Sequence, residues 1–252
     1  MDASLTNREK QILTGLYLSK FDREALKSLG FESFKESFNV LAPALGTRPA
    51  SIKNYRDEFD PLISKKRKGW HKRKTRDYCF HVYEKYNHLD FGTFTGLINS
   101  FVGYDANAES SISIIEDQTA QISSCAQRLI TGRAAEKYFV DIHPTIHEFH
   151  GYTSEDTTQL GCGYDFRLRI QPQDGQFLAI EVKGLRESTG TLSLTPKEYA
   201  IASSLRERFY LFVVSNFRES PTHMLYRNPL EAGLSFSKIE RTIIQTSWTV
   251  RV

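Results

Sequence analysis

Cysteine is scarce in this chain: only Cys79, Cys125 and Cys162 are found among 252 residues. They form no Cys-x-x-Cys pair and no array with histidine, so a zinc site is not expected. A low, odd number of cysteines is typical of proteins from a reducing compartment. A chain of this length can bury a sizeable apolar core, so we expect a fold that needs no disulfide bonds.

Long apolar segments are also missing. No stretch approaches the roughly 18 apolar residues that indicate a membrane-spanning helix. The first residues lack the basic and apolar regions of a secretory signal peptide. No internal repeat and no low-complexity tract is visible in the sequence. We therefore expect no membrane partner and a location in the bacterial cytoplasm.

Acidic residues are in the minority only in the first part of the chain. Residues 1–98 hold 18 Lys/Arg and 12 Asp/Glu, a net charge of +6, whereas residues 99–252 hold 15 and 18, a net charge of −3. A basic part beside a mildly acidic part indicates that the first binds a polyanion. The acidic excess in the second part is what carboxylates that hold a metal would produce.

The first hundred residues carry apolar side chains at helical spacing. Thr6, with Glu9 three positions later, is a typical helix start, and Pro61 ends a later helix. We expect a helical domain at residues 1–103, of helix-turn-helix or winged-helix type, followed by a polar linker at 104–119. The predicted helices span 6–18, 22–28, 31–45, 50–59, 77–86 and 90–101.

Residues 120–252 instead show short apolar runs that are typical of strands. A long helix is expected at 121–142, and a helix at 195–207 with Thr195 as its N-cap and Glu198 at its third position. Gln173-Asp174-Gly175 indicates a hairpin turn. The expected fold class is α+β or α/β, with a mixed sheet in this part. The predicted strands span 145–150, 163–170, 177–183, 209–215, 223–226 and 242–250.

Three charged residues lie on the two strands of the predicted hairpin. Asp165 lies on one strand, and Glu181 and Lys183 lie two positions apart on the next, so both point to the same face. Burying such charges is costly unless chemistry requires them. Metal-assisted phosphodiester hydrolysis fits: Asp165, Glu181 and the Val182 carbonyl can hold Mg²⁺, and Mn²⁺ is expected to substitute for it. Lys183 would orient a water or offset developing charge. The alternative is a structural salt bridge between Glu181 and Lys183.

Four segments occur in a characteristic order. Together they resemble the NO VEIN-type C-terminal nuclease domain, a branch of the PD-(D/E)XK superfamily found in restriction enzymes. The resemblance covers about residues 125–220, although Tyr164 stands where the superfamily has proline. The segments are Gly132-Arg133-Ala134-Ala135-Glu136, Gly161-Cys162-Gly163-Tyr164-Asp165, Ile180-Glu181-Val182-Lys183-Gly184 and Leu194-Thr195-Pro196-Lys197-Glu198-Tyr199.

The resemblance implies that Asp165, Glu181 and Lys183 are catalytic. It also implies that Glu136, on the helix before the sheet, is a fourth active-site carboxylate; the alternative is an exposed helix glutamate. Thr195 and Glu198 match the family as well, but we interpret them as a capping box on a helix packed over the site.

The basic part of the chain provides candidate DNA contacts. Residues 65–76 contain eight Lys/Arg with Trp70 and His71 between them, a loop able to neutralise DNA phosphates. The alternatives are a solvated charged loop or a generic RNA or polyphosphate patch. Upstream, side chains at 51–56 suit base edges or phosphates, although Arg56 could instead pair with Asp57 or Asp60. The candidates are Ser51, Lys53, Asn54, Tyr55, Arg56, Lys65, Lys66, Arg67, Lys68, Trp70, His71, Lys72, Arg73, Lys74, Arg76, His81 and Tyr83.

His81 and Tyr83 lie in an aromatic segment that we expect to be mostly core. They could also present an apolar wall to the methyl group of thymine or 5-methylcytosine. The two-domain plan resembles the BisI-like modification-dependent endonucleases, which cut methylated GCNGC sites.

These observations lead to one expectation and two alternatives. We expect a Mg²⁺-dependent type II restriction endonuclease that cuts double-stranded DNA as a homodimer, because one active site cuts one strand. The alternatives are a repair or junction-resolving PD-(D/E)XK nuclease and a DNA-binding module without catalysis.

Overall fold

The computed structural model describes residues 5–63, 74–102, 118–171 and 175–240, with only the backbone for 118–126. Six helices between residues 7 and 102 form what we call the helical bundle. Each lies where the apolar periodicity predicted a helix, and the Thr6–Glu9 capping box is present. The bundle consists of α1 (Asn7–Phe21), α2 (Arg23–Ser28), α3 (Phe34–Ala44), α4 (Pro49–Phe59), α5 (Asp77–Tyr86) and α6 (Phe91–Val102).

Helix α1 runs through the centre of the bundle. Its residues 12–19 are all buried, because α4 packs on one side of it and α6 on another. At the crossing with α4 the fit is so close that a Cβ atom on Gly15 would lie 2.4 Å from the Cβ of Tyr55. The buried Tyr17 hydroxyl lies 2.7 Å from the hydroxyls of Ser28 and Thr95, which ties α1 to α2 and α6.

A five-stranded mixed sheet forms the second part, in the order β1-β2-β3-β4-β5. Strands β3 and β4 are parallel and all other neighbours are antiparallel. The parallel pair is connected through helix α8 (Pro196–Leu205), which begins at the predicted N-cap Thr195. The mixed sheet expected from the sequence is therefore present. The strands are β1 (Thr153–Asp156), β2 (Phe166–Arg169), β3 (Leu178–Gly184), β4 (Phe209–Ser215) and β5 (Thr222–Arg227).

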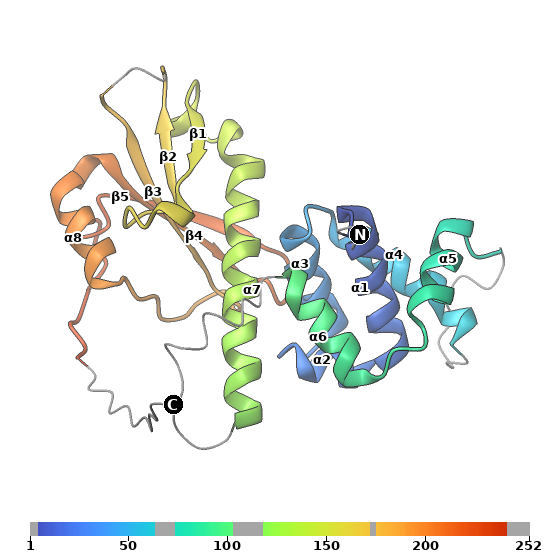
Figure 1. Cartoon of the computed structure of the whole chain (residues 1–252). Helices are drawn as coiled ribbons and strands as arrows, with labels where there is room; N and C mark the ends of the chain where they lie inside the picture. Colours follow the sequence, from blue (N-terminus) through green and yellow to red (C-terminus); the bar gives the residue numbers. More distant parts are fainter. Residues whose placement is uncertain (1–4, 64–73, 103–117, 172–174, 241–252) are drawn as a thin grey trace, which may run out of the picture.

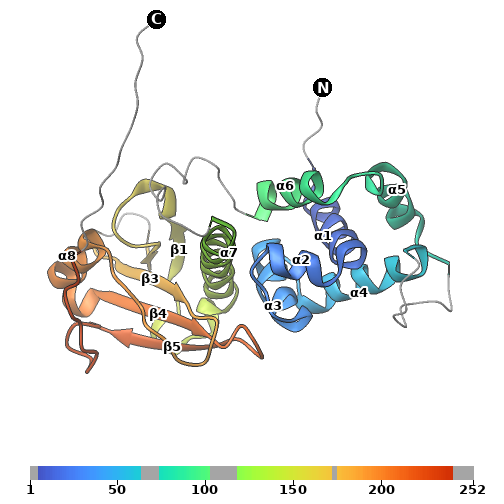
Figure 2. The same cartoon turned by 90° about the horizontal axis from the view of Figure 1, so that it is seen from below.

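Two helices cover opposite faces of the sheet. Ile180, Val182 and Phe212 join the apolar cluster that includes Phe139 of helix α7 (Gln118–Ile142), whereas Ala179 and Phe209 join the cluster that includes Ala202 of α8. Because side chains alternate along a strand, these neighbours lie on opposite faces. Helix α7 stands between the sheet and the bundle and packs against α3 (Figures 1 and 2). One apolar cluster continues from the bundle through α7 into the sheet.

The strand predicted at 145–150 is wrong. This segment forms two 3-10 turns, His143–Thr145 and His147–Phe149, and the first strand is Thr153–Asp156. Phe149 in this segment is buried for another reason: it packs against Phe139 and Tyr210. A short apolar run has no period of its own that could separate the two cases.

Several predictions fall on residues outside the described ranges. They are the strand at 242–250, most of the linker, turn residue Asp174 and loop residues 64–73. Residues 5–63 and 74–102 contain no strand that could serve as a wing, and the winged-helix type stays a prediction. Within the described ranges, no helix has the length and apolar character needed to cross a membrane.

Candidate active site

Lys183 is held between two carboxylates. Its Nζ lies 2.5 Å from Oε1 of Glu181, two positions earlier on β3, and 3.0 Å from Oε2 of Glu198 on α8. Alternation along β3 places Glu181 and Lys183 on the face that α8 covers. The Glu181–Lys183 salt bridge considered as an alternative is thus present, but Lys183 is shared with a third element.

Asp165 is placed beside this pair by the backbone. It directly precedes β2, and its N–H donates to the carbonyl of Ile180 at 2.9 Å. Its Oδ2 accepts a hydrogen bond from the N–H of Val182 at 2.8 Å, directly between Glu181 and Lys183 in the chain. The buried Thr157 hydroxyl donates to the Asp165 carbonyl at 3.1 Å. Asp165 is therefore fixed by β3 on one side and by Thr157, the residue after β1, on the other.

Helix α7 brings a further carboxylate, that of Glu136, toward the site. The helix approaches β3 closely at Gly184, where a Cβ atom would lie 2.8 Å from the carbonyl oxygen of Thr131. The glycine that follows Lys183 in the sequence motif is therefore a packing requirement. Glu136 is partly buried, not an exposed helix glutamate.

Burial and mutual repulsion dominate the electrostatics. Burial, together with the nearby Asp165 carboxylate, raises the pKa of Glu181 to about 8. Burial, with Asp165 and Asp156, raises the pKa of Glu136 to about 7. Burial also raises the pKa of Asp165. Burial alone would lower the pKa of Lys183, but Glu181 and Glu198 outweigh it and the pKa is raised, so this lysine is a cation at neutral pH.

The chemistry of these donors fits a hard divalent cation. Carboxylate oxygens are the ligands that Mg²⁺ and Mn²⁺ prefer. A cation would relieve the repulsion between Asp165 and Glu181. In the described ranges, no three His, Cys, Asp or Glu side chains are grouped at metal-binding distance. Coordination by Asp165, Glu181 and the Val182 carbonyl stays a prediction.

Two residues near the site were not assigned to it from the sequence. Glu198 was interpreted as part of a capping box, which is present, yet the same Oε2 that accepts the Thr195 N–H also accepts from Lys183. Asp156 lies on β1 and repels the Glu136 carboxylate. It was missed because the first strand was predicted at the wrong segment, whereas the position of Glu198 in a family motif was an available signal.

The predicted DNA contacts are only partly described. Lys53, Lys74 and His81 are exposed, while Ser51 and Asn54 are half-buried. His81 lines a pocket with Arg8 and Tyr78 at the junction of α1 and α5. The rest of the basic loop lies outside the described ranges, namely Lys65, Lys66, Arg67, Lys68, Trp70, His71, Lys72 and Arg73.

Two of the four arginines predicted to contact DNA, Arg56 and Arg76, lie in the described ranges, and both are engaged within the bundle. Arg56 pairs with Asp57 at 2.7 Å and lies over the ring of Phe34, so the alternative considered from the sequence is present. Arg76 pairs with the buried Glu58.

The two tyrosines predicted to contact DNA, Tyr55 and Tyr83, also make contacts within the bundle. Arg76 lies over the ring of Tyr55 at 5.5 Å. Tyr83 donates to the Leu62 carbonyl and stacks on Phe59, so it packs against the core although it is only half-buried. DNA contacts by these residues stay predictions.

The comparison with known families covers three of the four sequence segments in full and the last two residues of the first, Ala135 and Glu136. Residues 135–226 match the family model described as Protein NO VEIN, C-terminal. This family is associated with PD-(D/E)XK-like nuclease domains, and the matched region contains Glu136, Asp165, Glu181, Lys183 and Glu198. It spans just over a third of the chain and does not reach the helical bundle. No curated protein and no solved structure matches the chain.

Proposed function

We propose that the chain is a Mg²⁺-dependent endonuclease that hydrolyses phosphodiester bonds of double-stranded DNA. The observation that carries this proposal is the placement of Lys183, which lies within 3.0 Å of both Glu181 and Glu198 and follows the strand residue whose N–H fixes Asp165. A cation beside several buried carboxylates is an expensive arrangement for a fold, and catalysis of phosphoryl transfer explains it.

Each side chain has a distinct part in the proposed reaction. Asp165 and Glu181 offer oxygen ligands from adjacent strands. A bound Mg²⁺ would polarise the phosphoryl group and lower the pKa of a bound water. Lys183 is protonated, so it acts as a donor that orients the attacking water or stabilises charge on the phosphate oxygens, and not as the general base. Glu136 would accept a hydrogen bond from the water or hold a second ligand position.

The excess of positive charge in residues 1–98 supports a duplex DNA substrate. We propose further that the enzyme is a type II restriction endonuclease and acts as a homodimer, because one site cuts one strand and a symmetric pair cuts both. Dependence on 5-methylcytosine is the most specific part of the proposal, and it rests on the resemblance in the sequence alone.

Digestion experiments test each level. Purified protein with Mg²⁺ or Mn²⁺ is incubated with unmodified, cytosine-methylated and branched DNA, and the ends are sequenced. We expect site-specific double-strand cuts that are abolished by EDTA and by Glu181→Ala, but not by the matched change Glu240→Ala at an exposed residue. Cleavage of branched DNA alone would replace the restriction proposal with a junction-resolving one. No cleavage of any substrate would refute the enzyme proposal.

A further inference from the structure

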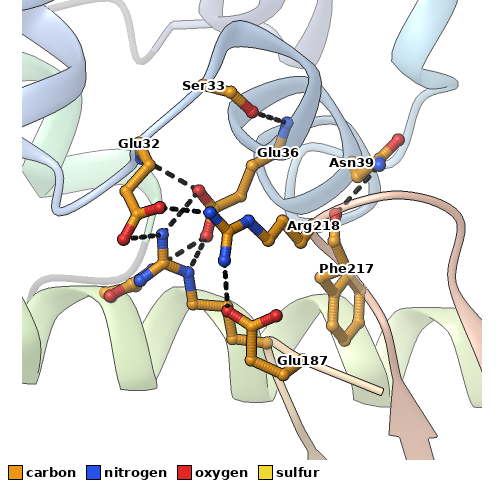
Figure 3. A network of polar contacts seen from close by, with 9 residues as sticks. Glu32, Ser33, Glu36, Asn39, Glu187, Phe217 and Arg218 are labelled. Carbon is orange, nitrogen blue, oxygen red and sulfur yellow. Dashed lines mark hydrogen bonds and ion pairs between the residues drawn. The ribbon is translucent and has the colours of Figure 1, made fainter.

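A fully buried carboxylate lies at the contact between the helical bundle and the sheet. Glu36 of α3, labelled in Figure 3, has no exposed surface. Both of its oxygens are engaged by Arg186. The Arg186 Nη2–Glu36 Oε2 distance is 3.0 Å. Gln127 of α7 donates to Oε1 at 3.1 Å, and the Glu32 N–H donates to Oε2 at 2.9 Å. Each of the two Glu36 carboxylate oxygens therefore accepts two hydrogen bonds.

Arg186 belongs to the continuation of the strand that carries the active-site residues. It lies three positions after Lys183, and its carbonyl accepts the N–H of Arg218 at 3.1 Å. The Leu185 N–H likewise donates to the Val214 carbonyl at 2.7 Å. Arg186 is thus held in an extension of the β3–β4 pairing and cannot shift without moving the end of β3.

Further directional contacts surround this pair. Arg218 Nη2 lies 2.6 Å from Glu32, and its Nη1 lies 2.9 Å from Glu187 (Figure 3). The buried Asn39 amide donates to the carbonyls of Phe217 and Glu219 at 2.9 and 3.0 Å. The first half of α3, together with Glu32 just before it, thereby contacts the two segments that follow β3 and β4.

Stability alone does not account for a charge in this place. Buried ion pairs contribute little net stability compared with well-packed apolar residues, but they specify one arrangement of the groups around them. Apolar packing of α3 on α7 already holds the bundle against the sheet. The paired fork of Arg186 and the carboxylate of Glu36 add geometric specificity, because both groups are planar and fit in one relative orientation.

We propose that Glu36 is a positioning residue for cleavage: by binding Arg186 it fixes the helical bundle in one orientation relative to the Glu181–Lys183 strand. DNA bound by the bundle then reaches the active site in a single register. This inference rests on the proposed nuclease function, which supplies the reaction whose position is set. Glu36 and Arg186 would thereby couple the DNA-binding position on the bundle to the position of cleavage in the active site.

The test compares Glu36→Gln with a matched control in the same interface. Lys35 neighbours Glu36 and also crosses to the sheet part, pairing with Glu219 at 2.5 Å, but both side chains are more than half exposed. We expect Glu36→Gln to keep DNA affinity while the single-turnover cleavage rate falls by about tenfold or more and the sequenced ends spread over several positions. Lys35→Ala should match the wild type in rate, ends and affinity. A folded Glu36→Gln protein that cuts at the wild-type rate and positions would overturn the proposal.

A second measurement does not depend on cleavage. Small-angle X-ray scattering of the free full-length protein should fit one arrangement for the wild type and a wider range, with a larger radius of gyration, for Glu36→Gln. If the wild type cuts no DNA, the proposed function fails, whereas an unchanged scattering profile for Glu36→Gln overturns the positioning role itself. The two failures are therefore distinct.

A double variant covers the case in which Glu36→Gln does not fold. Removing Glu36 alone leaves the partly buried Arg186 with Glu32 as its remaining acidic partner, at 3.1 Å. Glu36→Leu with Arg186→Met instead removes both charges of the pair and preserves apolar packing. This protein should fold and bind DNA but give scattered ends and a widened scattering profile. Wild-type ends and an unchanged profile from the folded double variant would overturn the proposal.

Discussion

Lys183 and Glu198 lie on different elements, β3 and α8, yet their charged atoms are 3.0 Å apart, and the same Glu198 oxygen caps the helix. Thr195→Ala and Glu198→Ala both remove the capping box, but only Glu198→Ala releases Lys183. Loss of the cap should cost about 1 kcal/mol of folding stability in either variant. The cleavage rate should fall by about tenfold or more only in Glu198→Ala, because Lys183 loses one of two orienting partners. Equal cleavage rates in the two variants would assign Glu198 to capping alone.

The glycine after Lys183 provides a test of the α7–β3 contact. Gly184→Ala places a methyl group 2.8 Å from the Thr131 carbonyl, so α7 must shift and carry Glu136 with it. We expect a loss of about 1–3 kcal/mol in folding stability and reduced cleavage. Gly132→Ala, on the same helix with open space around it, should instead leave stability unchanged or raise it slightly. Chemical denaturation and initial cleavage rates measure both effects.

The stability of the metal-free protein should depend on pH. The pKa of Glu181 is raised from 4.5 to about 8 and that of Glu136 to about 7, so the folded chain holds protons that the unfolded chain releases. Their contribution to stability is therefore lost as pH rises from about 5 to about 8. Thermal denaturation in EDTA should show this decline, and added Mg²⁺ should reduce it at the alkaline end. Glu181→Gln should flatten the slope, whereas Glu240→Gln should keep it.

The bundle surface can be tested with two residues of α4. Lys53 is exposed, whereas the Arg56 side chain is 13% exposed and paired with Asp57. Lys53→Ala should weaken DNA binding and reduce the salt dependence of the affinity by about one counterion. Arg56→Ala should instead lower the melting temperature, since it leaves Asp57 without its partner and removes a cation from the Phe34 ring. A reversed pattern would assign the DNA contact to Arg56.

The elements that the sequence predicted well have local causes. Helices α1 and α8 begin at Thr6 and Thr195 because a capping box needs only four consecutive residues. Strand β3 was predicted because a short apolar run that carries two charges two positions apart is typical of a strand with both charges on one face. Asp165, Glu181 and Lys183 were singled out from the sequence on the same local grounds, and the structure brings them together.

What could not be predicted depends on residues far apart in the chain. The strand containing Asp156 was misplaced because Phe149 is buried by α7 and β4, not by strand pairing. The Glu36–Arg186 contact joins residues 150 positions apart. Neither Glu36 nor Arg186 lies in a sequence pattern that distinguishes it from an ordinary surface charge. The contact between them is found only in the structure, where α3 packs against α7.

Helix α7 has a consequence for how the molecule unfolds. One of its sides completes the apolar cluster with β3 and β4, and another receives α3. Separating the bundle from the sheet would expose apolar surface of α7. It would also separate Arg186 from Glu36. The two parts should therefore lose their structure together, in a single calorimetric transition, so that a helix linking two functions also makes the chain one thermodynamic unit.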